Sequence, residues 1–163
     1  MNHAMLQRIV EEVAARLRRR ARSTATLSVA QLGEADIHSL LCQHASLRIV
    51  QVDLPLLEEL TGQRALAAAG CALHEAMAWG VRVQLTLLPA LLPALAVKKL
   101  ARLPLTFSDP PGQPVRLHAA SVLTYADVAR LHGGYLVLRR RPIITALARE
   151  AAVARHVQLI TQE

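Results

Sequence analysis

The chain alternates short extended runs with helical segments over most of its length. Apolar or β-branched runs that predict strands lie near residues 25–30, 47–53, 81–87 and 103–108. Helical spacing predicts helices at residues 34–44, 56–60, 65–80 and 89–101, with Gly33 separating the first strand from the first of them. Strands separated by helices pair through crossover connections. We therefore expect an α/β fold with a mixed or mostly parallel sheet and helical cover.

The pattern changes after residue 108. The segment SDPPGQPVRLH places three prolines and a glycine between two extended runs, which predicts either a hairpin or a longer excursion of the chain. A sub-boundary near residue 112 would be compatible with both. Four further elements are expected: a helix in YADVARL that begins at Thr124, a strand in YLVL, a helix capped by Thr145, and a last strand in VQLI. Residues 23–163 are thus expected to form one α/β domain.

Composition limits the class of protein. With 163 residues, 53% of them hydrophobic, the chain is long and apolar enough for one folded domain, and it does not have a disordered composition. Cys42 and Cys71 form no CxxC pair, so we expect neither a disulfide framework nor a zinc ribbon, and we expect a reducing compartment. The most apolar stretch, residues 83–97, is short and contains prolines, and charges interrupt the N-terminal apolar residues. No membrane span or signal peptide is expected, which indicates a cytoplasmic protein.

Residues 1–22 predict an amphipathic, arginine-rich helix. One narrow apolar stripe comprises Leu6, Ile9, Val10, Val13 and Leu17, and the opposite side of the helix is charged. Arg20 returns to the stripe, so the helix should end soon afterwards. A helix of this length is marginal alone in water, so the stripe requires burial. The residues alone favour burial against the chain's own domain over burial against a partner.

The chain has a formal net charge of +7, and most of its cationic side chains are arginines. One cluster, at the end of the first helix, includes Arg16, Arg18, Arg19 and Arg20, and a second run covers residues 139–141. A solvated basic face, a phosphate contact and docking onto an acidic protein surface all fit these clusters. Nucleic acid is disfavoured, because the few aromatic residues do not interleave with either run.

Motifs for catalysis or cofactor binding are absent from the sequence. There is no phosphate-binding glycine loop and no nucleophile elbow, and His38 with Cys42 forms an incomplete metal set. We therefore expect no enzyme, cofactor or metal. The alternative is an accessory protein that binds a small ligand, such as a flavin or a nucleotide, on a Rossmann-like sheet. Asp53 and the turn at residues 108–112 would then lie at the crevice, although turn formation or helix capping is the commoner role of such residues.

Several segments carry a resemblance to a known family. The segment LQRIVEEVAARL resembles the short encapsulation helices of bacterial microcompartment cargo. The likeness continues through CQHASLRIVQVDLPLLEEL, VKKLARLPLTF and ITALAREAAVARHVQLITQE. Over essentially its full length the chain resembles the PduM family of propanediol-utilisation microcompartment proteins, and its closing part is more weakly similar to segments of ethanolamine-utilisation proteins.

The resemblance implies a non-enzymatic structural component needed for assembly or stability of the microcompartment that degrades 1,2-propanediol. It implies docking to shell proteins, with encapsulated enzymes as a second class of partner. We expect the apolar stripe to dock and the adjacent arginines to steer the encounter. Encapsulation helices usually precede a flexible linker, whereas here a strand is expected soon after Ser23. A detachable helix and an integral one therefore both stay open.

Overall fold

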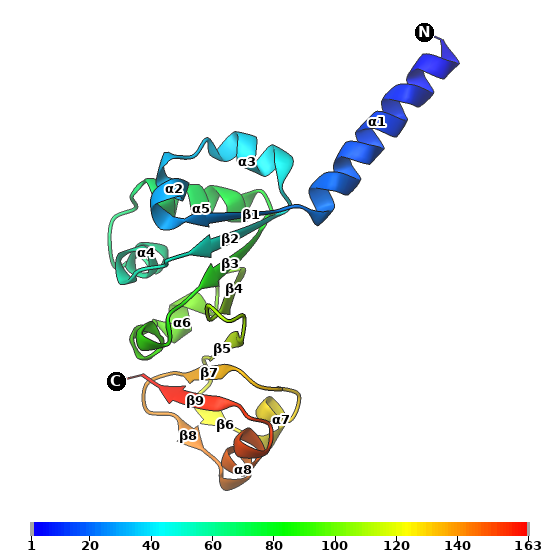
Figure 1. The fold of residues 1–163 in the computed structure, drawn as a ribbon. Coiled ribbons are helices and arrows are strands. Elements are labelled where there is room, and N and C mark those ends of the chain that lie inside the picture. Colours follow the sequence, from blue (N-terminus) through cyan, green and yellow to red (C-terminus); the bar gives the residue numbers. More distant parts are fainter. Residues whose placement is uncertain (1, 163) are drawn as a thin grey trace.

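A seven-stranded sheet forms the centre of the computed structural model, which describes residues 2–162 (Figure 1). In spatial order its strands are β1 (Thr24–Ser28), β2 (Ser46–Val50), β3 (Arg82–Thr86), β4 (Leu105–Ser108), β5 (Pro114–His118), β7 (Tyr135–Leu138) and β9 (Gln158–Thr161). All neighbours pair in parallel except β4 and β5, which are antiparallel. The expected α/β class with a mixed, mostly parallel sheet is confirmed.

Helices connect most of the strands. Helix α1 (His3–Arg22) precedes the first strand. The helices that follow are α2 (Val29–Glu34), α3 (Ile37–Gln43), α4 (Leu54–Leu60), α5 (Ala68–Ala78), the 3₁₀-helix η1 (Pro89–Ala94), α6 (Val97–Leu100), α7 (Tyr125–Val128) and α8 (Ala146–Ala154). A small parallel pair, β6 (Val122–Leu123) with β8 (Ile143–Ile144), accompanies α7 and α8. None of the helices in residues 2–162 combines the length and the apolar character needed to cross a bilayer.

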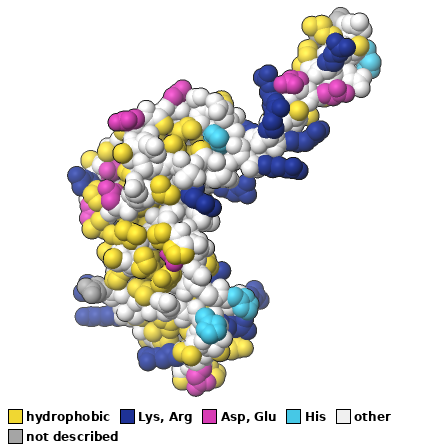
Figure 2. Space-filling view, in the orientation of Figure 1, with side chains coloured by type: hydrophobic (Ala, Val, Ile, Leu, Met, Phe, Trp, Pro, Cys, Tyr) yellow, Lys and Arg dark blue, Asp and Glu magenta, His cyan; other side chains and the backbone are white. Residues whose placement is uncertain are grey.

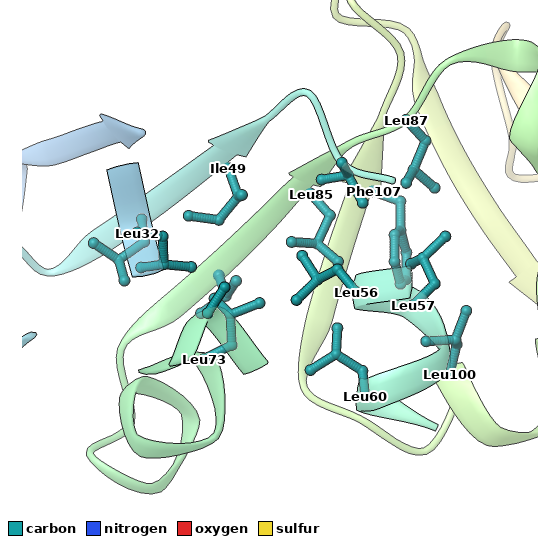
Figure 3. Close-up of a cluster of buried hydrophobic side chains, with 14 of the residues drawn as sticks. Leu32, Ile49, Leu56, Leu57, Leu60, Leu73, Leu85, Leu87, Leu100 and Phe107 are labelled. Atoms are coloured by element: carbon teal, nitrogen blue, oxygen red, sulfur yellow. The ribbon is translucent and has the colours of Figure 1, made fainter. Parts of the chain in front are cut away.

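Strand order determines which face the helices cover. From β1 to β4 each strand pairs with the next one along the chain, so every right-handed crossover places its helices on the same face of the sheet. Leucines of α2, α4 and α5 accordingly join Ile49 and Leu85 in one core, which Figure 3 shows. Val115 and Val137, from β5 and β7, belong to the same core.

The second half of the sheet, which consists of β5, β7 and β9, reverses this arrangement. The antiparallel step from β4 to β5 turns the strand direction around while the strand order continues the same way, so later right-handed crossovers lie on the other face. A second, smaller core forms there, in which Leu123, Val128 and Ala148 from the connecting segments meet Leu136 and Leu138 of β7. The two halves therefore carry their helices on opposite faces of one sheet.

Several predicted elements were wrong in detail. The strand expected at residues 47–53 ends at Val50, and the helix expected from Glu34 begins at Ile37. The first strand ends at Ser28 and not near residue 30, because Ser28 and Gln31 form a reciprocal capping box that begins α2, and Gly33 lies inside that helix. The single helix expected from Pro89 to Ala101 is split into η1 and α6. Pro93, which lacks an N–H donor, lies inside η1. The predicted hairpin at residues 108–118 and the helix starts at Thr124 and Thr145 are confirmed.

Candidate docking surface

Helix α1 projects from the body of the protein, with the N-terminus at its far end (Figure 1). The Asn2 side chain accepts a hydrogen bond from the Ala4 N–H at one end, and three arginines occupy the last turn at the other. Cations there are favoured by the negative end of the helix dipole. The predicted N-terminal helix is thus confirmed, and it ends at Arg22.

The apolar stripe of α1 is exposed. No residue of this helix is buried, and the five stripe side chains, Leu6, Ile9, Val10, Val13 and Leu17, are 43–59% exposed. Figure 2 shows hydrophobic side chains on the surface of the projecting helix. Burial against the chain's own domain, which the residues alone favoured, is therefore wrong. Met5, which lies outside the predicted stripe, is also exposed and adds apolar surface beside Leu6.

The base of α1 is fastened to the body by hydrogen bonds. The Ala45 N–H donates to the carbonyl oxygens of Arg20 and Ser23, at 3.2 and 3.1 Å. The Ser23 hydroxyl lies 2.5 Å from Nδ1 of His44. Strand β1 begins at Thr24, directly after these contacts, so the helix continues into the sheet without a linker.

The arginines of α1 divide into two groups. Arg16 and Arg19 approach the Glu12 carboxylate at 2.9 and 3.8 Å and stay exposed, as does Arg18. Arg20 differs, because its Nε donates to the Leu41 carbonyl oxygen at 2.9 Å and its side chain is half-buried. Arg20 thus fastens the helix to α3, whereas the side chains of Arg16, Arg18 and Arg19 are exposed.

The sequence comparisons place the chain in a family. A family model described as putative propanediol utilisation matches residues 8–158. The chain is 58% identical to the bacterial microcompartment assembly protein PduM of Salmonella typhimurium and 55% identical to that of Citrobacter freundii, in each case over all of both chains. The chain belongs to the PduM family. The search of solved structures gave no significant match.

The match to the two PduM relatives bears on α1. Because both alignments cover the complete chains, the projecting helix lies inside the shared region and is not an addition specific to this chain. The family model begins at Arg8, so it includes most of the apolar stripe as well.

Elsewhere in this PduM-family chain, the side chains of Asp53 and Asp109 accept hydrogen bonds from backbone N–H groups. The Asp53 carboxylate accepts from the Leu56 N–H at 3.1 Å and caps α4. The buried Asp109 carboxylate accepts from the Gln113 N–H at 2.6 Å and stabilises the β4–β5 turn. The capping and turn roles expected as the commoner ones are confirmed. Only Asp109 lines the cleft at the carboxyl ends of the first strands.

The candidate metal ligands of the PduM-family chain do not come together. His38 Nε2 lies 3.5 Å from the Glu75 carboxylate, and its ring contacts the edge of Trp79. Both cysteines, Cys42 and Cys71, are exposed. Across residues 2–162 no three His, Cys, Asp or Glu side chains are grouped closely enough to hold a metal ion.

Proposed function

We propose that this chain is a non-enzymatic assembly component of the bacterial microcompartment that degrades 1,2-propanediol, and that α1 docks it to a shell protein of that compartment. Family membership supports the compartment, since both relatives are named microcompartment assembly proteins. Its place of action is then the microcompartment.

The observation that carries the docking step is the exposed stripe on a fastened helix. Each of its five large apolar side chains contributes roughly 1.5–3 kcal/mol when it moves from water into a fully apolar site. Hydrogen bonds at Arg20, Ser23 and Ala45 already fix the base of the helix, so less conformational freedom is lost on binding than for a helix on a flexible linker. An amphipathic helix with one apolar face suits an apolar groove.

The charged side chains of α1 indicate which kind of partner groove would bind it. Arg16, Arg18 and Arg19 are exposed beside or behind the stripe, and Glu12 is the carboxylate that approaches two of them. A partner groove with acidic side chains along its rim complements this arrangement. Such complementarity mainly raises the association rate and the specificity. Encapsulated enzymes with the same kind of groove are the second class of partner.

The test uses two full-length variants that change net charge equally. Val13→Glu places a carboxylate within the stripe, and Ala15→Glu places one on the opposite side of the same helix. We expect Val13→Glu to lose co-sedimentation with purified microcompartments, because docking would bury an unpaired charge. Ala15→Glu should sediment like the unchanged protein.

Circular dichroism of each variant shows whether the body is folded. If folded Val13→Glu still sediments with the particles, α1 is not the docking element. Equal loss for both variants would assign the effect to charge and not to the stripe. A third arm raises the salt concentration, which should slow association of the unchanged protein by screening its arginines.

A further inference from the structure

The sheet topology leaves one face of β1–β4 uncovered. Parallel strands are usually covered on both faces, because their crossover helices distribute to both sides. Here all connections of β1–β4 lie on one side, and within residues 2–162 no helix packs against the other. We call this uncovered surface the open face.

Strand register places a polar row across the open face. Thr26, Arg48, Gln84 and Thr106 are consecutive partners on β1–β4. Their neighbours Leu47 and Ile49 point into the core, so side-chain alternation directs the row to the opposite side. Arg48 and Thr106 are exposed there.

A cleft of about 570 Å³ lies on the open face at the carboxyl ends of these strands. Ligands of open α/β sheets bind at this end of the strands, and the volume lies within the range of small-molecule sites. Apolar side chains, including Val50, Val52 and Leu88, line one part of the cleft. The β4–β5 turn, through Pro110 and Gly112, lines another.

Arg48 is held in the cleft by a chain of side chains. The buried Ser108 hydroxyl accepts from Gln84 Nε2 at 2.9 Å, and Gln84 Oε1 accepts from Arg48 Nε at 3.4 Å. Within residues 2–162 no carboxylate lies within 4 Å of this guanidinium. Its cleft neighbour Asp109 instead accepts from a backbone N–H. The guanidinium is thus oriented, and no anionic partner for it lies among the described residues.

From these observations we propose that the cleft binds a small organic anion with a short apolar body. The carboxylate or phosphate head meets Arg48, whose planar group pairs well with either. The body lies against Val50 and Leu88. This site is on the α/β body and does not depend on docking by α1.

The experiment follows backbone amides of the full chain by ¹H–¹⁵N NMR during titration with hexanoate, hexyl phosphate or hexanol. We expect the two anions to shift amides around Gln51, Val52 and Gly112, which line the cleft. Comparison of hexanoate with hexyl phosphate shows which head group is preferred. Hexanol, which lacks the charge, should bind about tenfold more weakly or worse.

Two exposed arginines on the open face give a matched pair of variants. Arg48→Met should weaken hexanoate binding about tenfold, because it removes the charge and keeps an apolar stem. Arg82→Met, on β3 outside the cleft, should leave the affinity unchanged. Absence of anion-induced shifts at the cleft, shifts confined to α1, or equal binding by the Arg48→Met variant would each overturn the site. If the Arg48→Met variant fails to fold, equal affinity of the unchanged protein for hexanoate and hexanol would overturn the site.

Discussion

Right-handed crossovers place the helices of the two halves of the sheet on opposite faces. In both, parallel strands are joined by crossovers with helices, and the strand order advances in the same direction. The strand reversal between β4 and β5 places the helices of β1–β4 on one face and α7 with α8 on the other. A single hairpin thus determines that the helices of the second half cover the face opposite to the one that α2, α4 and α5 cover.

The halves also differ in how much apolar surface they bury. The larger core extends from β1 to β7, while the smaller core is confined to the segments around α7 and α8. Val115 and Val137 of the second half pack into the larger core. We therefore expect the halves to unfold together, with the second half more easily loosened. The proposed sub-boundary near residue 112 stays a prediction.

The largest expected effect tests whether the halves are coupled. Leu85→Ala empties a site on β3 that is fully buried, and it should lower the free energy of unfolding by about 2–5 kcal/mol. Because Val137 of β7 shares that core, amide exchange should also accelerate in β7. Chemical denaturation and hydrogen exchange measure the two effects.

Leu17→Ala is the matched control, since it makes the same truncation on the exposed stripe of α1. Its effect on unfolding should stay within about 0.5 kcal/mol. If Leu85→Ala leaves exchange in β7 unchanged, the halves are separate domains and the boundary near residue 112 is real. If Leu17→Ala destabilises as strongly, the stripe is buried in solution.

An intermediate effect is expected at the start of β7. Gly134 has φ +77°, and a Cβ there would collide with the carbonyl oxygen of Pro114 at the start of β5. Gly134→Ala should cost at least about 1–2 kcal/mol, from the left-handed backbone alone, and more from the collision. Exchange should accelerate in β7 and β9 more than in β1–β3.

Gly133→Ala separates the two causes. Gly133 also has positive φ, at +63°, but its added Cβ would lie 3.4 Å from the flexible end of Gln113. We expect a smaller loss of stability, measured by the same denaturation. Equal losses for both variants would mean that the close approach of β5 to β7 contributes nothing.

Local signals made much of the fold predictable. The alternation of strands and helices, the Pro/Gly hairpin and the starts at Thr124 and Thr145 depend on neighbouring residues, so the sequence displays them directly. The limit of β1 was missed because Ser28 and Gln31 form a capping box inside what reads as a β-branched run. Strand order depends on long-range pairing, which no local pattern encodes.

The candidate sites were harder to predict from the sequence, because they too depend on long-range contacts. Apolar spacing shows which side of α1 requires burial, but it does not say whether the partner is the same chain. The role of Arg20 depends on the Leu41 carbonyl, 21 residues away, and could not be separated from the roles of Arg16, Arg18 and Arg19. The cleft at Arg48 brings together four strands whose order was unknown.

The smallest effect concerns the cap of α7, in the second half only. The backbone N–H and the hydroxyl of Thr124 donate to the Asp127 carboxylate at 2.8 and 2.7 Å. These bonds, with a smaller contribution from His118, lower the pKa of Asp127 below its ordinary value. Since the folded pKa is the lower one, the cap contributes its full stability above the unfolded pKa, near 4, and loses it as the pH falls through the folded value.

The pH dependence of an Asp127→Ala variant tests this contribution. Its difference in unfolding free energy from the unchanged protein should be small and constant between about pH 5 and 7, and should shrink below about pH 4. Denaturation titrations across this range measure the difference, and amide exchange in α7 locates it. A difference that grows in acid would assign the cap to the protonated carboxyl. An effect that extended equally to β1–β4 would show that even this exposed cap is coupled to the larger core.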